Sequence, residues 1–108
     1  MNDDARVVRE IAAVSDGDVP HVIHHYLYTP TREAAGQVAK VLRQRGFDVE
    51  ERLGGDGVNW LVLGHHEVVP TEQLMTSLRH SLEALASEVG GEYDGWEADV
   101  RHRVPTSH

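Results

Sequence analysis

Two segments of this sequence, 31–46 and 68–91, carry helix-type periodicity with start and stop signals, and they divide the rest of the chain into strand-length pieces. Thr29 or Thr31 can cap the first helix, and Gly46 follows its last turn. The second helix begins after Thr71 and ends at two glycines. Each helix has one apolar stripe: Ala35, Val38, Ala39 and Leu42 in the first, and Leu74, Leu78, Leu82, Leu85 and Val89 in the second.

Four strand-like segments flank these helices. The segment "HVIHHYLY" (21–28) is rich in β-branched and aromatic residues, and "FDVEERL" (47–53) alternates apolar and charged positions. A "GGDG" hairpin signal leads to the apolar "VNWLVLGHH" (58–66), and "GGEYDGWEADV" (90–100) supplies the last strand. The order strand, helix, strand, strand, helix, strand predicts an α+β, ferredoxin-like βαββαβ sandwich, with two helices on one face of a four-stranded antiparallel sheet.

The chain has 108 residues, which is enough for one domain. We expect residues 1–19 to form an N-terminal arm or short helix, residues 20–100 the ferredoxin-like domain, and residues 101–108 a flexible tail. No apolar run is long enough for a membrane helix, the first residues are acidic and unlike a signal peptide, and cysteine is absent. These features predict a cytoplasmic protein that contacts no membrane.

The net charge of −8 is unevenly distributed along the chain. Residues 31–46 carry four basic side chains against one acidic, whereas residues 47–100 carry twelve acidic side chains against two arginines. Phosphate binding depends on lysine and arginine, so the acidic half does not suit direct nucleic-acid binding. The third strand supports this, because its one aromatic residue is Trp60 and it lacks the basic residues of an RNA-binding sheet. The charge instead favours a basic protein partner.

Tyrosine and acidic residues form the candidate protein-binding surface. Strand alternation places Tyr26 and Tyr28 on one face of the first strand, together with His24. In the last strand, the same alternation predicts that Trp96 faces the helices with Ala98 and Val100. Tyrosine is common among the residues that dominate interface energies. The predicted surface consists of Tyr26, Tyr28, Tyr93, Glu97 and Asp99, the last three on the outward side of the fourth strand.

Eight histidines raise the alternative of a metal site, for which His24, His66 and a fourth-strand carboxylate are the candidate ligands. Adjacent histidines on a strand point to opposite faces, and zinc needs three or four converging ligands. The chain has no HxH or HExxH spacing, so we predict no metal and no cofactor. It also lacks a GxSxG motif, a phosphate-binding loop and a cysteine nucleophile, and a paired-carboxylate site at Asp94 and Glu97 would require a bulge at Gly95. We therefore predict that the protein is not an enzyme.

Three stretches resemble the ribonuclease E inhibitor B family, also called regulator of ribonuclease E activity B. They are "HHYLYTPTREAAGQVAKVLRQRGFDVE", "NWLVLGHHEVVP" and "GGEYDGWEADV", and the resemblance extends over about residues 20–100. The resemblance implies a non-catalytic ferredoxin-like domain that binds the large RNA-degrading endonuclease and alters its activity or the composition of its complex. The best-known members carry a longer acidic N-terminal region than this chain.

The partner implied in this way is a ribonuclease E-like endoribonuclease or another basic protein. Two alternatives from other classes stay open at this point. One is a ferredoxin-like domain that binds a small ligand or a metal, and the other is a domain of unknown role that forms a homodimer through its uncovered sheet face.

Overall fold

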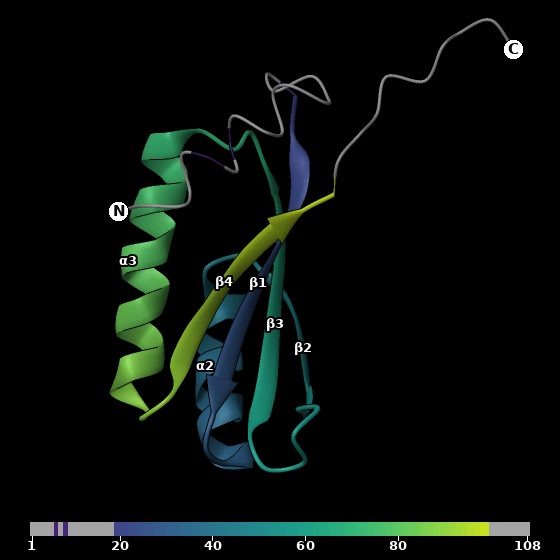
Figure 1. The fold of residues 1–108 in the computed structure, drawn as a ribbon, viewed down its shortest axis with the longest axis vertical. Coiled ribbons are helices and arrows are strands. Elements are labelled where there is room, and N and C mark those ends of the chain that lie inside the picture. The colour runs from purple at the N-terminus through teal and green to yellow at the C-terminus, as the bar shows by residue number, and fades with distance from the viewer. Residues whose placement is uncertain (1–5, 7, 9–18, 100–108) are drawn as a thin grey trace, which may run out of the picture.

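The chain folds around one central sheet in the computed structural model, which describes residues 6, 8 and 19–99. The described elements follow the order β1 (His21–Thr29), α2 (Arg32–Gln44), β2 (Asp48–Leu53), β3 (Trp60–Val68), α3 (Glu72–Glu88) and β4 (Glu92–Ala98). The four described strands pair antiparallel in the order β2-β3-β1-β4 (Figure 1). This arrangement confirms the predicted α+β, ferredoxin-like fold. The predicted tail 101–108, Val100 and nearly all of the predicted arm 1–19 lie outside the described residues.

Both helices begin and end where the sequence signals predict. The Thr31 hydroxyl accepts a hydrogen bond from the Ala34 N–H (3.1 Å), and the Thr71 hydroxyl caps α3 in the same way through the Leu74 N–H (3.1 Å). Thr29 does not cap α2, because its hydroxyl donates to the Thr31 carbonyl instead. Gly46 and Gly90 follow the two helices with φ angles of 92° and 73°, a left-handed conformation that glycine adopts without strain.

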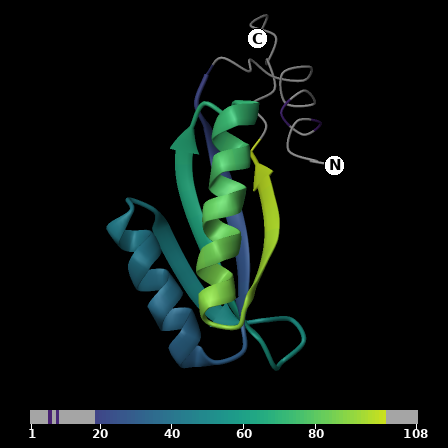
Figure 2. The same ribbon diagram turned by 90° about the vertical axis from the view of Figure 1, so that its left-hand side faces the viewer.

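The apolar core lies between the sheet and the two helices, which Figure 2 shows on the same side of the sheet. The predicted stripe of α2 is buried in full, and in α3 Leu82 and Leu85 are buried. Met75 is also fully buried, although the predicted stripe of α3 did not include it. Neither of the two described helices combines the length and the apolar character that crossing a membrane requires.

Strand register decides which side chains face the helices and which face away. The fully buried Ile23 and Leu27 of β1 face the helices, so alternation turns His24 and Tyr26 to the other side. Their partners in β3 are His65 and Leu63. No described helix covers this second side, which we call the open face (Figures 1 and 2). Its residues in β1, β3 and β2 are Val22, His24, Tyr26, Tyr28, Leu61, Leu63, His65, Glu67, Asp48, Glu50 and Arg52.

Candidate functional site

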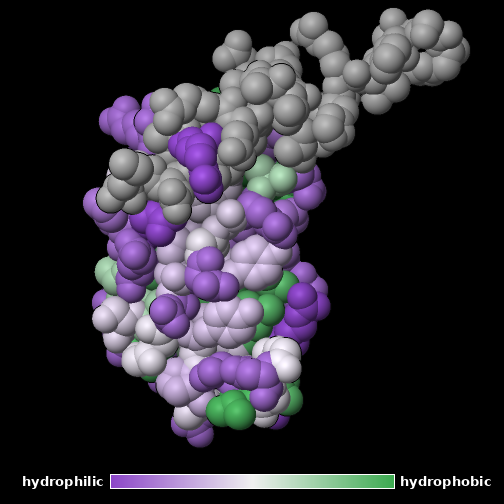
Figure 3. All heavy atoms as spheres, viewed as in Figure 1, coloured by the Kyte–Doolittle hydropathy of each residue, from purple (hydrophilic) through white to green (hydrophobic). Residues whose placement is uncertain are grey.

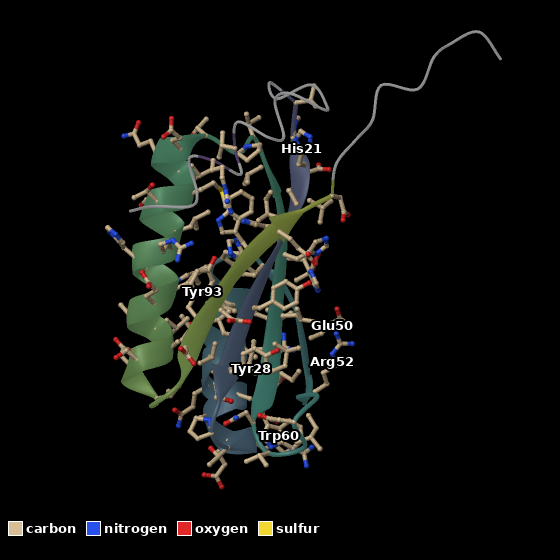
Figure 4. The ribbon with its side chains drawn as sticks, in the orientation of Figure 1. His21, Tyr28, Glu50, Arg52, Trp60 and Tyr93 are labelled. Atoms are coloured by element: carbon tan, nitrogen blue, oxygen red, sulfur yellow. The ribbon has the colours of Figure 1, made fainter. Side chains whose placement is uncertain are left out.

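The open face carries most of the residues that the sequence singles out. Figures 1 and 4 view the sheet from its β4 edge, with the helices to the left of the open face. The structure places Tyr26 and Tyr28 there, joined by Glu97 of β4, which pairs with His24, and by Asp99, which follows β4. In the same view from the β4 edge, strongly and weakly hydrophilic side chains surround small hydrophobic areas (Figure 3). Four of the five predicted binding residues therefore share one surface.

A chain of polar side chains runs across the open face, from the residue that follows β4 through β1 and β3 to β2. Asp99 Oδ1 lies 3.0 Å from His24 Nε2, and His24 Nδ1 lies 2.7 Å from His65 Nδ1. On the far side, His65 Nε2 lies 2.7 Å from Glu50 Oε2. We call these residues the histidine chain: Asp99, His24, His65 and Glu50.

The histidine chain orders its two imidazoles. A bond between two Nδ1 atoms needs one donor and one acceptor, so at least one of the two rings is neutral while the bond exists. The flanking carboxylates accept from the outer N–H groups and hold both rings in place. The side chains of Asp99 and Glu50 are still 66% and 61% exposed, so each keeps oxygen lone pairs that face solvent. The histidine chain thus has two hydrogen-bonded imidazoles at its centre and a solvent-accessible carboxylate, Asp99 or Glu50, at each end.

Tyr26 is held to the neighbouring strand by a carboxylate. Its hydroxyl donates a hydrogen bond to Glu97 Oε1. This bond raises the pKa of the Tyr26 phenol, since losing the proton would break it, and partial burial of the ring adds to the shift. Tyr26 is therefore a neutral donor with a fixed ring, and Tyr28 lies two residues further along the same strand on the same face. An aromatic ring that is fixed in this way, as Tyr26 is, loses little conformational entropy when a partner binds it.

Tyr93 does not lie on the open face, so the prediction that it faces outward is wrong. It is 9% exposed, pairs with Leu27, and its hydroxyl is hydrogen-bonded to His25 Nδ1 at 2.9 Å on the helix side. Figure 4 shows its ring between β4 and α3, where the Arg79 guanidinium carbon lies 5.8 Å from the ring centroid.

A bulge in β4 explains the position of Tyr93. Trp96 pairs with His25 and Tyr93 with Leu27, so two residues of β4 stand opposite Tyr26 alone. One of the two is Gly95, whose φ of 101° suits a bulge. The extra residue turns Tyr93 and Trp96, three positions apart, to the same face. Trp96 packs against the core as predicted.

The candidate metal ligands His24 and His66 do not converge. His24 lies on the open face, whereas His66 lies on the helix side, where its ring stacks on Phe47 with 4.4 Å between centroids and its Nε2 is 2.9 Å from His25 Nε2. Burial lowers the pKa of His66, because the charged imidazolium would lose its hydration there. Since β1 and β3 pair His24 with His65, the proposed ligand set is wrong. Within residues 6, 8 and 19–99, no group of three or more histidine and acidic residues is placed to hold a metal ion.

A hollow of about 330 Å³ lies at one end of the open face, where β1 ends and β4 begins. It offers the ring of Tyr28 and the carboxylate of Glu92, which together suit a cationic group better than an anion. The hollow extends the open face rather than forming a separate enclosed site. Its lining residues are Tyr28, Thr29, Pro30, Asn59, Gly90, Gly91 and Glu92.

Sequence reasoning did not name Glu50 and Arg52 as site residues. Both project from β2 on the side away from α3, as Figure 4 shows. The signal was present in "FDVEERL", where the apolar positions Val49 and Leu53 mark the helix side, so that alternation places Glu50 and Arg52 on the open face. What the segment could not reveal is that Glu50 reaches His65, because that contact depends on the pairing of β2 with β3.

Comparison with known proteins yields one family. The family model described as "Regulator of ribonuclease activity B" matches residues 2–98, a range that includes all six described elements. No curated protein matches the chain significantly.

Proposed function

The chain belongs to the regulator of ribonuclease activity B family, and from this premise we propose that it regulates an endoribonuclease by binding it through the open face of the sheet. The family name describes a regulator of ribonuclease activity rather than a ribonuclease. The observation that supports binding is the open face itself. It carries two neighbouring tyrosines, one of them fixed by a hydrogen bond, and a row of carboxylates, and no described helix covers it.

The tyrosines supply the contact area of the proposed interface. Tyr26 and Tyr28 are half-buried, so each has one exposed side and one side packed on the sheet. Their neighbours Leu61 and Leu63 are almost fully covered, at 7% and 4% exposure. Aromatic side chains that are fixed before binding are the usual anchors of protein interfaces.

The acidic groups of the open face favour a basic protein partner over RNA. Glu97 and the two ends of the histidine chain, Asp99 and Glu50, border the tyrosines on both sides. Their charge steers a basic protein segment toward the face and repels RNA phosphates. A ribonuclease E-like endoribonuclease that presents a basic segment is therefore the proposed partner, and we place the complex in the cytoplasm.

A binding titration tests the proposed function. The purified chain is titrated against a ribonuclease E-type endoribonuclease by calorimetry, and RNA cleavage is followed in parallel. Tyr28→Ala should weaken binding roughly tenfold or more, the usual cost of truncating an aromatic anchor. The chain alone should cleave no RNA, and it should change the cleavage rate of the endoribonuclease.

Charge-neutral variants on the other side of the molecule provide the control. Glu83→Gln and Glu88→Gln remove exposed carboxylates from α3 and should leave the affinity unchanged. If the α3 variants weaken binding as much as Tyr28→Ala does, the open face is not the interface. If the wild-type chain does not bind even at low salt, the proposal fails altogether.

A further inference from the structure

The edge strand β2 has a row of outward backbone groups that pair with no other strand in the described part of the chain, and the register shows which residues carry them. β2 lies at the end of the sheet order, and β3 is its hydrogen-bonded neighbour in the described part of the chain. Gly54 N–H donates to Asn59 O (2.7 Å), so this pair is a hydrogen-bonded one. In an antiparallel ladder, hydrogen-bonded pairs alternate with non-hydrogen-bonded pairs. Arg52 and Glu50 lie two and four residues before Gly54, so their backbone N–H and C=O groups are hydrogen-bonded to β3. The residues whose N–H and C=O groups point outward are Val49, Glu51 and Leu53.

The contact of Arg43 with this edge agrees with that assignment. The Arg43 guanidinium donates to the Val49 carbonyl at 3.4 Å, which it reaches from the outer side of the strand. The Arg43 side chain is 53% exposed, so its guanidinium can release the Val49 carbonyl at little cost while it stays beside the Glu51 carboxylate. Glycine, proline and bulges, which interrupt many edge strands, are absent from Asp48–Leu53. Four of the six side chains are charged, and charged side chains oppose edge pairing, so the edge can pair only with a strand whose charges are complementary.

A second copy of β2 fits this edge in one register. When two copies pair antiparallel about a two-fold axis at Glu51, each Glu50 stands opposite Arg52 of the other copy, and the outward backbone groups meet in hydrogen-bonded pairs. A two-fold axis at Glu50 would place the Glu50 side chains of the two copies opposite each other. A two-fold axis at Arg52 would place the two Arg52 side chains opposite each other. Opposite-charge cross-strand pairs stabilise a sheet and like charges destabilise it, so the charges select the axis at Glu51.

In the same register, the side chains of β2 that face the helices also match those of the second copy. Leu53, which is 50% exposed, stands opposite Val49 of the other copy, so pairing covers an apolar side chain that the single chain leaves in water. The two Glu51 side chains face each other, but each carboxylate has the Arg43 guanidinium of its own chain 3.5 Å away. This neighbouring charge reduces the repulsion between the glutamates.

The helices allow the two copies to approach. α2 packs against both β2 and β3, so its axis lies roughly one strand spacing, about 5 Å, from the two-fold axis. The two α2 helices would then lie about 10 Å apart, an ordinary distance for packed helices. Gly36 is on the side of α2 over this edge, since an added Cβ would lie 3.8 Å from Glu51 Oε1. The absence of a side chain there leaves room for the second helix.

We propose that two copies of this chain associate through β2 into a continuous eight-stranded sheet centred on Glu51. The partner of this surface is a second copy, and the two open faces lie on the same side of the joint sheet. The inference goes beyond the proposed function, because self-association needs no ribonuclease. A dimer would present two binding surfaces at once, which strengthens binding to a target with repeated basic segments.

Sedimentation equilibrium of the full chain tests the proposal through a charge swap. The wild-type chain should form dimers as its concentration rises. Glu50→Arg and Arg52→Glu each turn two attractive contacts into two repulsive ones, and each should raise the dissociation constant of the dimer roughly tenfold or more. The double variant with both changes restores opposite charges and should recover dimerisation. A wild-type chain that stays monomeric, or a double variant no better than the single ones, overturns the proposal.

A single cysteine tests the register even if a charge variant fails to fold. The chain has no cysteine, so Glu51→Cys can form a disulfide only between two copies. At the two-fold axis the two Cα atoms would be about 5.5 Å apart, within the range of a disulfide. Mild oxidation should therefore cross-link Glu51→Cys rapidly, whereas the control Glu83→Cys on the exposed side of α3 should stay monomeric. Equal cross-linking of both variants would exclude the β2 interface.

Discussion

Tyr26 and Tyr93 show how strongly the surroundings decide the role of one residue type. The Tyr26 hydroxyl donates to an exposed carboxylate on the open face, whereas Tyr93 is buried against the helices and bonded to His25 at 2.9 Å. A hydrogen bond in water is replaced easily when it is lost, but a buried group without its partner keeps the cost of desolvation. The two tyrosines should therefore respond differently to loss of the hydroxyl.

We predict that Tyr93→Phe lowers the free energy of unfolding by about 1–2 kcal/mol, because it leaves the fully buried His25 without its hydroxyl partner. Urea unfolding followed by circular dichroism measures this effect. The matched control Tyr26→Phe should cost less than about 0.5 kcal/mol, since solvent replaces the lost bond. Equal losses in the two variants would contradict the buried position of Tyr93.

We predict that His66 contributes to the acid sensitivity of the fold. Its pKa in the folded chain is lowered by burial from its usual value of 6.5, so the unfolded chain binds the proton more readily. The resulting stability is fully present above the unfolded value and declines as the pH falls from there through the folded pKa. Urea unfolding at several pH values between neutrality and mild acid should show this decline. The decline of the free energy of unfolding with falling pH should be shallower in His66→Gln. An unchanged slope would show that His66 does not cause the acid sensitivity.

At the scale of elements, the two edges of the sheet differ in one decisive feature. β4 contains the bulge at Gly95, which turns Tyr93 and Trp96 to the core and interrupts regular pairing along that edge. β2 is regular over its six residues and exposes alternate backbone groups. This difference is why the inferred contact between copies involves β2 and not β4.

We predict that Gly95→Ala destabilises the chain by about 1–2 kcal/mol, because a side chain at a φ of 101° is strained. The matched control is Gly55→Ala in the β2–β3 turn, where φ is not positive and an added Cβ meets no atom within 4 Å. Its effect on thermal unfolding should be close to zero. A Gly95 variant as stable as the control would mean that β4 tolerates a side chain in the bulge.

At the scale of the whole molecule, charge is separated between the helix α2 and the rest of the chain. The basic side chains of residues 31–46 lie mainly on α2, on the helix side of the sheet, whereas Glu50, Glu97 and Asp99 lie on the open face. The net charge of −8 is thus concentrated away from α2. The carboxylates of the open face therefore contribute to the attraction of the basic partner that we propose.

We predict that the association rate with the endoribonuclease falls steeply as salt rises from low to moderate concentration, because dissolved ions screen this attraction over about 10 Å at 0.1 M. Stopped-flow binding across a salt series measures the rate. Tyr28→Ala should instead raise the dissociation rate by a similar factor at every salt concentration. An association rate that does not depend on salt would remove the acidic groups from the proposed mechanism.

The amino-acid sequence alone determined the order of the elements, the cap at Thr71 and the faces of β1, and it limited the cap of α2 to Thr29 or Thr31. These features depend on residues close together in the chain: alternation needs only neighbours, and a cap needs a hydroxyl within three residues of its N–H. The shared face of Tyr26 and Tyr28 followed from the same local rules, and the pairing of β1 with β4 then placed Tyr26 beside Glu97.

The tertiary structure decided the rest, because register and bulges are properties of strand pairs. The pairing of β1 with β3 brings His24 to His65 rather than to His66, and the extra residue in β4 moves Tyr93 into the core. The bonds of β2 to β3 likewise determine which backbone groups point outward at Glu51. A one-residue shift in any of these pairings would turn the side chains of one strand to the other face, and the register that avoids this is selected by burial of the apolar face and by turn geometry when two strands pair.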